Sequence, residues 1–582
     1  MVYAQGILTD RVWTDPEQTI DESTLNQICA HLGISSGLCQ ILAARDVRST
    51  SEISRFLNPG PEQLHDPFLM AGMEAAVARI RQAILNFEKI LIFGDYDVDG
   101  TASAAILYNY FKRLGARVHY FLPNRLVDGY GLNVPTIDKI HATRVDLLIT
   151  VDNGSTACEE SKYLKKLGID LIITDHHKLG PDMPTAVALV NPHQPGCGYP
   201  FKNLSATGVA YKLICALDNR LSADDFWDIR GICHTLPSYY LDLVALATVA
   251  DMSPLVGENR VLVKLGLEMI NTRPRPGLAG LIKECNVRSG VSPNVINFKI
   301  APKINALGRI GDPALGIQML LTRSFTEGRR LARHLVSVNR SRQEIEKTAL
   351  AGAMKQAESQ QSNPALVLVG KDWHPGVISI IATRIAGQFQ KPTVVISLYH
   401  GDVALGSARG NGQFDILHAL GCCESTLKRF GGHVNAAGLA LHPANLSAFT
   451  AQFMKAIAEA QDGPRKPDQK CIAIDTWIQP EHLDCKFIEE IGRLSPFGFG
   501  NPEPVIAVHG LDVGHPSVFQ NRHLKLQLNC AQGHEIEAVA WDHSALAEHL
   551  KGTFDIAFVP QLTYSAQGVK TQLKVVDLRA TA

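Results

Sequence analysis

Three aspartates at alternate positions in the segment KILIFGDYDVDG, residues 89–100, are the side chains with the clearest chemical meaning in this chain of 582 residues. They are Asp95, Asp97 and Asp99, and they directly follow an apolar run that ends at Gly94. Carboxylates this close together repel one another and raise each other's pKa unless a cation neutralises them. The ordinary alternative is a solvated acidic turn, but the preceding apolar run favours a cation site.

Short apolar runs alternate with helical patterns after residue 73. The predicted strands are residues 90–93, 117–122, 146–151, 170–174 and 186–190, and the helix after the aspartates is predicted over 101–114. Strands that alternate with helices predict a parallel, doubly wound sheet. Ligands of such sheets bind beyond the carboxyl ends of the strands. We therefore expect the aspartates to lie at the functional edge of an α/β domain.

Further acids and histidines follow other predicted elements. They are Asp152, Asp175, His176, His177 and, after the buried helix 241–250, Asp251. One acidic strand end is common, whereas three on one sheet edge indicate a site. Carboxylates with one or two imidazoles suit Mn²⁺ or Mg²⁺ better than structural zinc, which prefers cysteine. The carboxylates suffice for two ions about 3.5–4 Å apart, a pair that activates water and stabilises the leaving oxygen of a phosphoester.

The composition narrows the class of protein. The 56 basic and 57 acidic residues give a formal net charge of −1, so any nucleic-acid surface must be local. The 12 cysteines form no C-x-x-C pair, which is typical of free thiols in a reducing cytoplasm. No apolar run reaches about 18 residues, so we expect no membrane span. We expect a cytoplasmic enzyme that is monomeric and has no membrane association.

A long polar helix, residues 326–360, is predicted to lead to a second α/β unit. That unit contains a predicted helix over 416–430 and the glycine-rich turn GGHVNAAG, 431–438. Backbone N–H groups and short hydroxyls in such turns can crowd a phosphate. The candidate anion-binding side chains are Ser407, Arg409 and His433.

Six short alternating runs after Pro464 predict a small β-barrel. Candidate base-stacking rings are Phe497, Phe499, Phe519, Trp541 and Tyr564, interleaved with Arg522, His523 and Lys525. Taken singly, each ring is more simply explained as barrel core. The segment as a whole favours nucleic-acid binding.

The motifs DYDVDG, DNG, DHH and ATVADMSPL match, in this order, the four metal motifs of the DHH phosphoesterase superfamily. GKDWHPGVI, GSARG and GGHVNAAG are similar to its DHH-associated domain. PNRLVDGYG, APKINALGR and SPFGFGNPEP narrow the resemblance to the RecJ family of single-strand-specific 5′→3′ DNA exonucleases. DHH alone is weakly specific, whereas four ordered motifs with the downstream segments are highly specific.

The residue patterns and the resemblance divide the chain into five parts. They are an N-terminal helical segment (1–60), a DHH catalytic domain (61–323), a connecting helix (324–360), a DHH-associated substrate-binding domain (361–462) and an OB-like nucleic-acid-binding domain (463–582). The expected fold is α/β, with a parallel-sheet DHH domain and a second α/β domain joined by a long helix, and with a C-terminal β-barrel.

The resemblance implies a metal-binding role for specific residues. The implied ligands are Asp97, Asp99, Asp152, His176 and Asp251, with Asp152 as the bridge and Asp95 as either a ligand or a close partner. His177 would orient water or the scissile phosphate, and Asp175 would fix the tautomers of the histidines.

Substrate contacts are implied as well. They are Arg125, Ser407 and Arg409 for a terminal 5′-phosphate, Arg309 and His433 for phosphates nearer the ions, Tyr130 for base stacking, and Asn305. A terminal phosphate is a dianion that converging arginine and serine donors can hold. A surface ion pair is the ordinary alternative for Arg409. Lys303 and Leu307 depart from the family pattern in APKINALGR, 301–309, which we predict to be a glycine-containing loop.

The function implied by the resemblance is hydrolysis of single-stranded DNA from the 5′ end to 5′-mononucleotides with two Mn²⁺ or Mg²⁺ ions, in DNA recombination and repair. A single-strand-binding protein and a RecQ-type helicase are the expected protein partners. One alternative is a small-substrate DHH phosphodiesterase acting on nanoRNA, cyclic dinucleotides or phosphoadenosine phosphate. Another is a catalytically inactive DNA-binding scaffold, which the intact acids of all four motifs disfavour.

Overall fold

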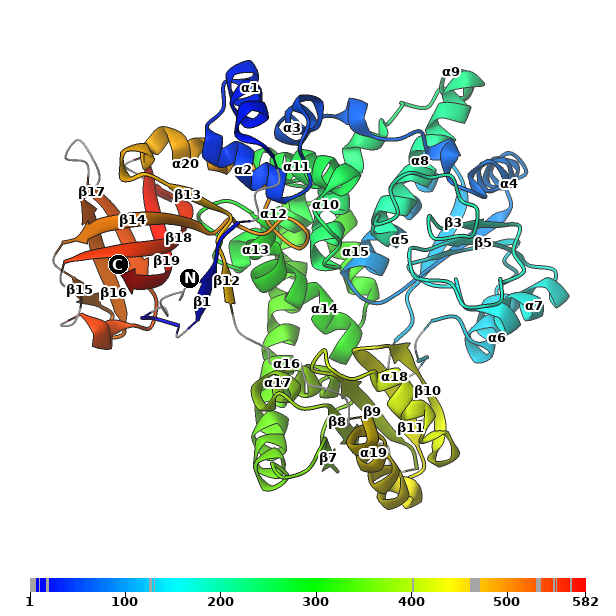
Figure 1. The fold of residues 1–582 in the computed structure, drawn as a ribbon. Coiled ribbons are helices and arrows are strands. Elements are labelled where there is room, and N and C mark those ends of the chain that lie inside the picture. Colours follow the sequence, from blue (N-terminus) through cyan, green and yellow to red (C-terminus); the bar gives the residue numbers. More distant parts are fainter. Residues whose placement is uncertain are drawn as a thin grey trace.

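Two α/β sheets and a β-barrel surround a central group of helices (Figure 1). The computed structural model describes residues 7–9, 11–16, 20–124, 128–129, 131–399, 402–460, 471–514, 516–529, 535–547, 550, 552–565 and 568–581. The barrel lies on one side of the central helices and the first sheet on the other, with the second sheet below them in this view. Helix α16, Phe325–Ser359, runs from the central helices to the second sheet.

The first sheet carries the predicted functional edge. Its five strands are β2 (Lys89–Gly94), β3 (Arg117–Phe121), β4 (Leu147–Val151), β5 (Asp170–Thr174) and β6 (Ala188–Val190). All are parallel, in the order β3-β2-β4-β5-β6. The chain therefore reverses its winding direction between β2 and β4. The carboxyl ends of these two strands flank the position where such sheets bind ligands.

Helices cover both faces of this sheet because its strands are apolar on both sides. Ile90 and Ile92 face a cluster with α4 (Met73–Leu85), α5 (Val98–Arg113) and α8 (Ala206–Ala223), whereas Leu91 and Phe93 face one with α6 (Val134–Ala142) and α7 (Cys158–Lys166). Helix α5 begins three residues before the predicted start at residue 101. The reason is that the Asp97 carboxylate accepts a hydrogen bond from the Gly100 N–H (3.0 Å) and caps the helix.

The central helices include α10 (Leu241–Ala250), α11 (Gly257–Thr272), α12 (Pro276–Glu284) and α14 (Ala301–Ile310). The prediction of a loop at 301–309 is wrong, because this segment forms α14. Its apolar side chains Ile304 and Leu307 are buried in the central cluster. A Cβ at Gly308 would lie 2.6 Å from a ring carbon of Tyr96, so the glycine serves close packing rather than a turn.

The second sheet is mixed, in the order β10-β11-β9-β8-β7, with only β7 and β8 parallel. Its strands are β7 (Leu366–Gly370), β8 (Thr393–Ser397), β9 (Ala404–Arg409), β10 (Leu427–His433) and β11 (Ala436–Leu441). Helices α18 (Ile416–Gly421) and α19 (Leu446–Ala460) cover one face, and α17 (Ile378–Phe389) with α16 covers part of the other. The predicted helix 416–430 is wrong beyond Gly421, because pairing with β11 outweighs the local helical pattern in β10.

The C-terminal domain is a closed barrel. Its ring contains β14 (Ile506–Val513), β18 (Thr553–Ser565), β19 (Gly568–Ala580), β17 (Glu535–Ala540) and β16 (His523–Asn529), and a pairing of β14 with β16 closes it. The predicted α/β fold with a long connecting helix and a C-terminal barrel is therefore confirmed.

The start of the chain packs on this C-terminal domain. Strand β1, Val12–Thr14, pairs in parallel with β12, Cys471–Ala473. Helices α1 (Glu22–Leu32), α2 (Ser36–Ala44) and α3 (Thr50–Leu57) share one hydrophobic cluster with α20 (Cys485–Gly492) and the barrel. The first and last parts of the chain thus form one body.

Among the described residues, no single helix is long and apolar enough to cross a membrane. Helices α1 and α2 reach the length and apolar composition of a membrane span only when they are taken together, and they are bent by 115° relative to each other.

We expect Leu42→Ala to destabilise this combined body by about 2–5 kcal/mol, because it leaves a cavity at a fully buried side chain. Fluorescence-detected denaturation reports on the body, since Trp13 and Trp477 lie in it with ring centroids 6.0 Å apart. Leu85→Ala on α4 is the control, because Leu85 is 37% exposed and its loss should stay within about 0.5 kcal/mol. Equal denaturation midpoints for the two variants would contradict the shared core.

Candidate metal centre

The predicted acids and histidines meet at one edge of the first sheet. Asp95, Asp97 and Asp99 follow β2, Asp152 follows β4, and the Asp175-His176-His177 run follows β5. Asp251 caps the end of α10. Since β2, β4 and β5 are consecutive in the sheet, their carboxyl ends lie side by side.

Three overlapping groups of side chains could each hold an ion. They are Asp95 with Asp97 and Asp152, Asp152 with His176 and His177, and Asp99 with His176 and Asp251; within each group the ligand atoms lie within 4.8 Å of one another. Asp152 and His176 belong to two groups each. The sharing makes one continuous centre from residues that are far apart in sequence.

The electron-donating nitrogen of His176 faces the carboxylates. Its Nδ1 lies 3.1 Å from the Leu204 carbonyl oxygen, which can only accept, so the proton sits on Nδ1. Its Nε2 lies 3.3 Å from Asp152 Oδ1 and 4.0 Å from Asp99 Oδ2. This Nε2 is buried and has no hydrogen-bond partner among the described residues. A buried lone pair beside carboxylates fits a metal ion.

Asp99 is anchored by the amino end of α8. Its carboxylate accepts hydrogen bonds from the N–H groups of Ala206 and Thr207, both at 2.8 Å, and from the Thr207 hydroxyl at 2.6 Å. The first turn of a helix carries free N–H donors and partial positive charge, so it stabilises a buried carboxylate. These contacts fix the orientation of the side chain.

Asp175 points into the scaffold rather than into the ligand groups. It accepts hydrogen bonds from the N–H groups of Ser155 (3.0 Å), His176 (2.8 Å) and His177 (3.2 Å). It also lies 2.8 Å from Nδ1 of His177, which places the proton of that ring on Nδ1. This geometry suits the fixing of the His177 tautomer.

The backbone is strained where the centre needs it. Asp152 has a φ of 62°, a left-handed backbone conformation that residues other than glycine rarely adopt. Such strain is typical of functional sites, where the surrounding structure imposes it. A Cβ at Gly100 would lie within 2.7 Å of three backbone atoms of Asp95, so only glycine allows the aspartate loop to fold this tightly.

The carboxylates of the centre resist ionisation together. Burial and then repulsion from Asp99 raise the pKa of Asp97 above its usual value and that of Asp251 to about 7. Burial and the charges of Asp97 and Asp99 raise the pKa of Asp152 well above its usual value. Burial opposes protonation of His177, but the hydrogen bond and charge of Asp175 raise its pKa to about 9. A bound cation would relieve the repulsion.

Two of the predicted substrate-binding residues lie on α14. Asn305 Oδ1 accepts a hydrogen bond from the Val98 N–H (3.0 Å), so this side chain braces the aspartate loop. Arg309 donates to Ser379 Oγ (3.0 Å) at the start of α17 and to the Gly376 carbonyl oxygen (3.1 Å). Helix α14 therefore connects the metal loop with the second α/β unit.

The predicted anion-binding residues of the second unit share one face of its sheet. Ser407 and Arg409 are two residues apart on β9, and Arg409 donates to Ser407 Oγ (3.0 Å) and Thr383 Oγ1 (3.2 Å) of α17. His433 lies across β11 from Arg409. A Cβ at Gly431 or Gly438 on this face would meet nothing within 4 Å, so the floor beside these side chains is open. Arg125 and Tyr130 lie outside the described residues.

The candidate stacking rings differ in exposure. Phe499 is 58% and Trp541 43% exposed, whereas Phe497 packs on the C-terminal hydrophobic cluster. Phe519 and Trp541 form an edge contact with centroids 6.0 Å apart. The side chain of Tyr564 lies outside the described residues.

Sequence reasoning missed the groups that hold the ligands in place. Thr207 and the Leu204 carbonyl oxygen contact Asp99 and His176, and Ser253 donates to Asp251 Oδ2 (2.7 Å). A helix start could be predicted at Ser205, which caps α8. No local signal showed that this helix points at Asp99.

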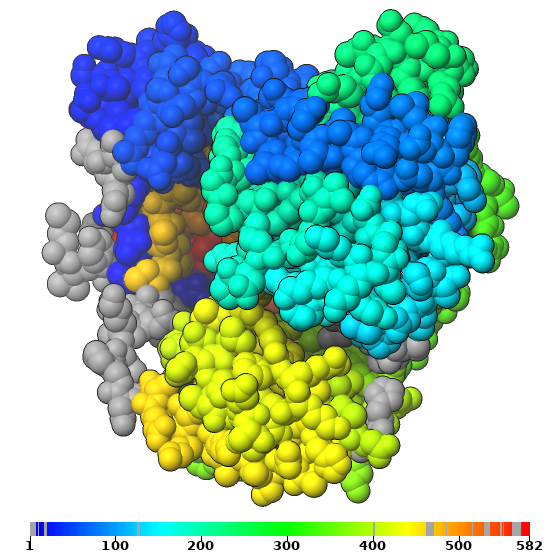
Figure 2. Space-filling model, turned by 90° about the vertical axis from the view of Figure 1, so that its right-hand side faces the viewer, coloured from blue at the N-terminus to red at the C-terminus, as the bar shows by residue number. Residues whose placement is uncertain are grey.

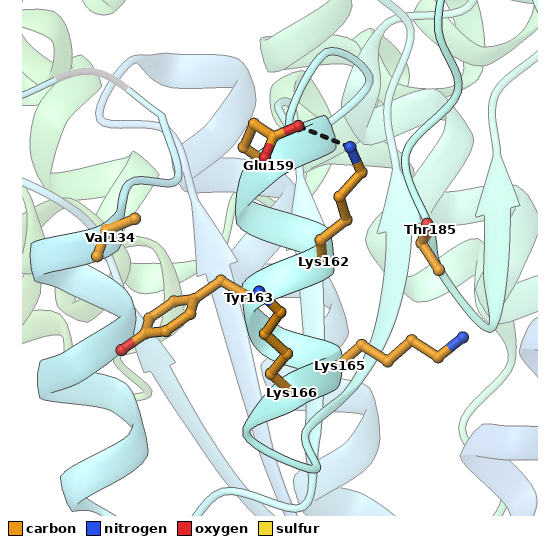
Figure 3. Close-up of a pocket in the computed structure, with 7 residues that line it drawn as sticks. All are labelled: Val134, Glu159, Lys162, Tyr163, Lys165, Lys166 and Thr185. Atoms are coloured by element: carbon orange, nitrogen blue, oxygen red, sulfur yellow. Dashed lines mark hydrogen bonds and ion pairs between the residues drawn. The ribbon is translucent and has the colours of Figure 1, made fainter.

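A cavity of about 650 Å³ lies elsewhere on the first domain, beside α6 and α7 (Figure 3). Its lining residues are Val134, Glu159, Lys162, Tyr163, Lys165, Lys166 and Thr185. Lys162 pairs with Glu159 at 2.7 Å. None of these residues belongs to the ligand groups, and the lysines form the solvated face of an amphipathic helix.

Comparison with known proteins shows which domain families the chain contains and which proteins it resembles. The chain matches the DHH family, N-terminal domain, at residues 89–248, the DHHA1 domain at 362–459 and the RecJ OB domain at 474–577. It is 32% identical over 569 residues to the single-stranded-DNA-specific exonuclease RecJ of Bacillus subtilis (strain 168), across 96% of this chain and 70% of that protein. It is 31% identical over 509 residues to the Escherichia coli (strain K12) protein of the same description, across 85% and 87% of the two chains. The chain belongs to the RecJ family.

Solved structures agree with this assignment. The crystal structure of RecJ in complex with Mn²⁺ from Thermus thermophilus superposes with a TM-score of 0.80 at 29% identity, over 98% of this chain and 80% of that one. The Mg²⁺ complex of the same protein gives a TM-score of 0.75 at 27% identity, over 98% and 78%.

Without divalent ions, we expect the chain to lose stability as pH rises from about 4 to about 9. Because the native pKa of Asp251 is about 7, the folded state binds this proton more tightly than the unfolded state, and the advantage is lost as pH rises through 7. His177, with a pKa of about 9, loses its contribution between about 6.5 and 9. The check is the melting temperature in a chelator across this range.

Asp251→Asn should flatten the lower part of that dependence, whereas Asp182→Asn, at an exposed position, should leave it unchanged. Adding Mn²⁺ should raise the melting temperature most at high pH, where the carboxylates are ionised. A melting temperature in chelator that stays constant between about pH 5 and 7 would contradict the buried repulsion.

Proposed function

We propose that this chain is a metal-dependent 5′→3′ exonuclease specific for single-stranded DNA, which releases 5′-mononucleotides by phosphodiester hydrolysis. The observation that carries the proposal is the sharing of Asp152 and His176, which joins three ligand groups into one centre. The RecJ relatives are single-stranded-DNA-specific exonucleases, and this supports the substrate class. DNA recombination and repair is the setting that we assign on the same ground.

The donor set fits two divalent cations, Mn²⁺ or Mg²⁺. The proposed ligands are Asp95, Asp97, Asp99, Asp152, His176 and Asp251. Carboxylate oxygens with one imidazole match either ion, and the related Thermus thermophilus structures contain one or the other. Such ions, when bound, activate water and neutralise charge on the phosphate and the leaving oxygen.

The chain's own residues position the substrate and a proton-transfer group. Asp175 holds the Nδ1 proton of His177, which leaves Nε2 of that ring for a phosphate oxygen or a water. His177 is half-buried at the edge of the centre, so it can reach a bound strand. The proposed catalytic residues are Asp97, Asp99, Asp152, His176, His177 and Asp251.

We assign recognition of the strand end to the second α/β unit. Ser407 and Arg409 carry a hydroxyl and a guanidinium on one face, and the guanidinium lies beside the open floor at Gly431 and Gly438. Ser407 is 4% exposed and accepts a hydrogen bond from Arg409, so it also holds the guanidinium in place. A terminal phosphate carries more charge than an internal phosphodiester, so such donors favour an end. Arg125, Tyr130, Asn305, Arg309 and His433 complete the proposed substrate-binding set.

The arrangement of the domains supports a path for a single strand. Arg309 and Arg409 approach α17 at Ser379 and Thr383, one turn apart, so the metal domain and the end-binding face converge on this helix. Figure 2 shows the surface hollowed between the N-terminal helices and the first α/β domain, with residues of the C-terminal domain at its back. The exposed rings of Phe499 and Trp541 can stack on bases along the C-terminal domain.

Partners and compartment follow from the proposed substrate. We propose a single-strand-binding protein and a RecQ-type helicase as partners, because they would present or generate single strands. The cysteines in the described part of the chain are free thiols, which supports a reducing compartment such as the cytoplasm.

The small-substrate alternative can be tested on the intact chain. Deleting the C-terminal domain would also expose the core that it shares with α1, α2 and α3, so loss of activity after deletion would be ambiguous. Comparing dinucleotides or cyclic dinucleotides with strands of about 20 nucleotides avoids this problem, since an OB fold binds about 4–16 nucleotides. We expect the long strands to be degraded with the higher kcat/KM.

We expect 5′-labelled single strands to release labelled mononucleotides first, and 3′-labelled strands to shorten from the other end, with Mn²⁺ or Mg²⁺ present. Asp152→Asn should lower kcat by more than about a hundredfold, beyond the loss typical of an outer-sphere partner. Asp182→Asn is the matched surface control. Degradation from 3′ ends, or equal rates on blunt duplex, would refute the proposal.

Arg409→Gln should lower kcat/KM for 5′-phosphorylated strands by about ten- to a hundredfold, the worth of one charge-assisted hydrogen bond. Strands with a 5′-hydroxyl should be affected much less, because they lack the charge that Arg409 binds. The control is Arg340→Gln, whose guanidinium pairs with Glu344 on the exposed face of α16. An equal loss of kcat/KM on both kinds of strand would show that Arg409 does not bind the terminal 5′-phosphate.

A further inference from the structure

The loop after the proposed ligand Asp251 is held by a turn of the C-terminal domain. The Leu255 N–H donates to the carbonyl oxygen of Phe499 at 2.7 Å. Gly500 has a φ of +74°, and a Cβ there would lie 2.8 Å from Pro254 Cβ. A Cβ at Gly498 would lie 2.7 Å from Leu255 Cδ1. The two segments are therefore in backbone contact, with no room for a Cβ at Gly498 or Gly500.

The loop in turn contacts the ligand itself. Ser253 donates from its hydroxyl to Asp251 Oδ2 at 2.7 Å, and Ser253 is 7% exposed. Asn259 donates to the Pro254 carbonyl oxygen at 3.0 Å. Because Leu255 follows Asp251 so closely in the chain, a shift of Pro254 or Leu255 moves the ligand.

The turn, residues 497–501, is itself rigid. Asn501 is 1% exposed and donates to the carbonyl oxygens of Leu494 (2.8 Å) and Pro496 (2.9 Å). Arg45, from the end of α2, donates to Asn501 Oδ1 and to the Pro502 carbonyl oxygen (2.8 Å). The end of α2 thus braces the turn through Asn501 and Pro502.

A buried arginine fixes the same junction from the catalytic side. Arg260 of α11 is 2% exposed and donates to the carbonyl oxygens of Phe56 (2.9 Å), Leu494 (2.7 Å) and Arg493 (3.0 Å). Burial of this cation is costly unless its donors are satisfied. Its three partners come from α3 and from the segment after α20, so Arg260 joins three parts of the chain at one point.

We infer that the turn 497–501 is a positioning element for Asp251, so that the C-terminal domain is a structural part of the metal centre in addition to binding DNA. This inference deepens the proposed function and rests on it only in taking Asp251 as a metal ligand. Groups that orient metal ligands change metal affinity by about 10–100-fold when they are lost. The barrel domain therefore controls kcat by positioning Asp251. It controls substrate affinity separately, through its own surface.

Gly500→Ala is the direct test, because the added Cβ pushes on Pro254. Its matched control is Gly510→Ala, in the same domain and with a similar φ of +62°, where the nearest atom is Thr581 Cγ2 at 3.9 Å. Both variants carry the backbone strain, but only the first presses on the Asp251 loop. We expect Gly500→Ala to weaken Mn²⁺ binding by about tenfold, measured by calorimetry without DNA, and to lower kcat with little change in KM.

Arg45→Met provides a second variant if Gly500→Ala fails to fold, because it removes the brace on Asn501 without adding an atom near Pro254. Arg48→Met is its control, since Arg48 pairs with Asp46 at the surface (2.7 Å). We expect weaker Mn²⁺ binding in Arg45→Met alone. Mn²⁺ affinities equal to those of the controls would overturn the inference. The Mn²⁺ affinity is measured without DNA, so it tests this inference alone. Failure of the exonuclease proposal would instead appear as a lack of 5′→3′ degradation by the wild-type chain.

Discussion

Repulsion among buried carboxylates is the constraint on which the rest of the structure depends. Asp95, Asp99 and Asp152 are each less than a tenth exposed, at the ends of neighbouring strands. Such a group is costly to fold unless donors and cations offset it. The fold supplies fixed donors to some members, such as the α8 amino end for Asp99. The oxygens and the His176 nitrogen that remain facing one another are the ones left for cations.

The parts of this centre that follow from local pattern could be predicted from the sequence. Acids directly follow strand β2, and acids also directly follow β4 and β5. A parallel sheet therefore had to bring these acids to one edge. The order of the motifs added Asp251, which no periodicity places near the others. The long helix α16 was predictable because it contains no helix breaker strong enough to end it over 35 residues.

What could not be predicted depends on tertiary contacts. APKINALGR forms a helix whose Ile304 and Leu307 are buried in the central cluster and whose Gly308 lies against Tyr96, contacts that no local propensity reveals. The segment 427–433 has a helical apolar pattern but pairs with β11. The residues that orient the ligands, Thr207 and Ser253, are ordinary cap and loop residues by sequence. Their role exists only because distant elements meet, and the division of the chain into domains stays a prediction for the same reason.

The shared junctions argue against a modular view of the chain. Helix α17 receives Arg309 from the metal domain and Arg409 from its own sheet, so this one helix links the metal domain to the sheet that carries Ser407 and Arg409. At the opposite side, Arg260 joins the metal domain to the C-terminal body. An exonuclease must hold the terminal phosphate one nucleotide from the bond it cuts, and misplacement of about 1 Å can cost a hundredfold in rate. Hydrogen bonds between packed elements, rather than flexible linkers alone, connect the metal domain with both neighbouring units and so limit such misplacement.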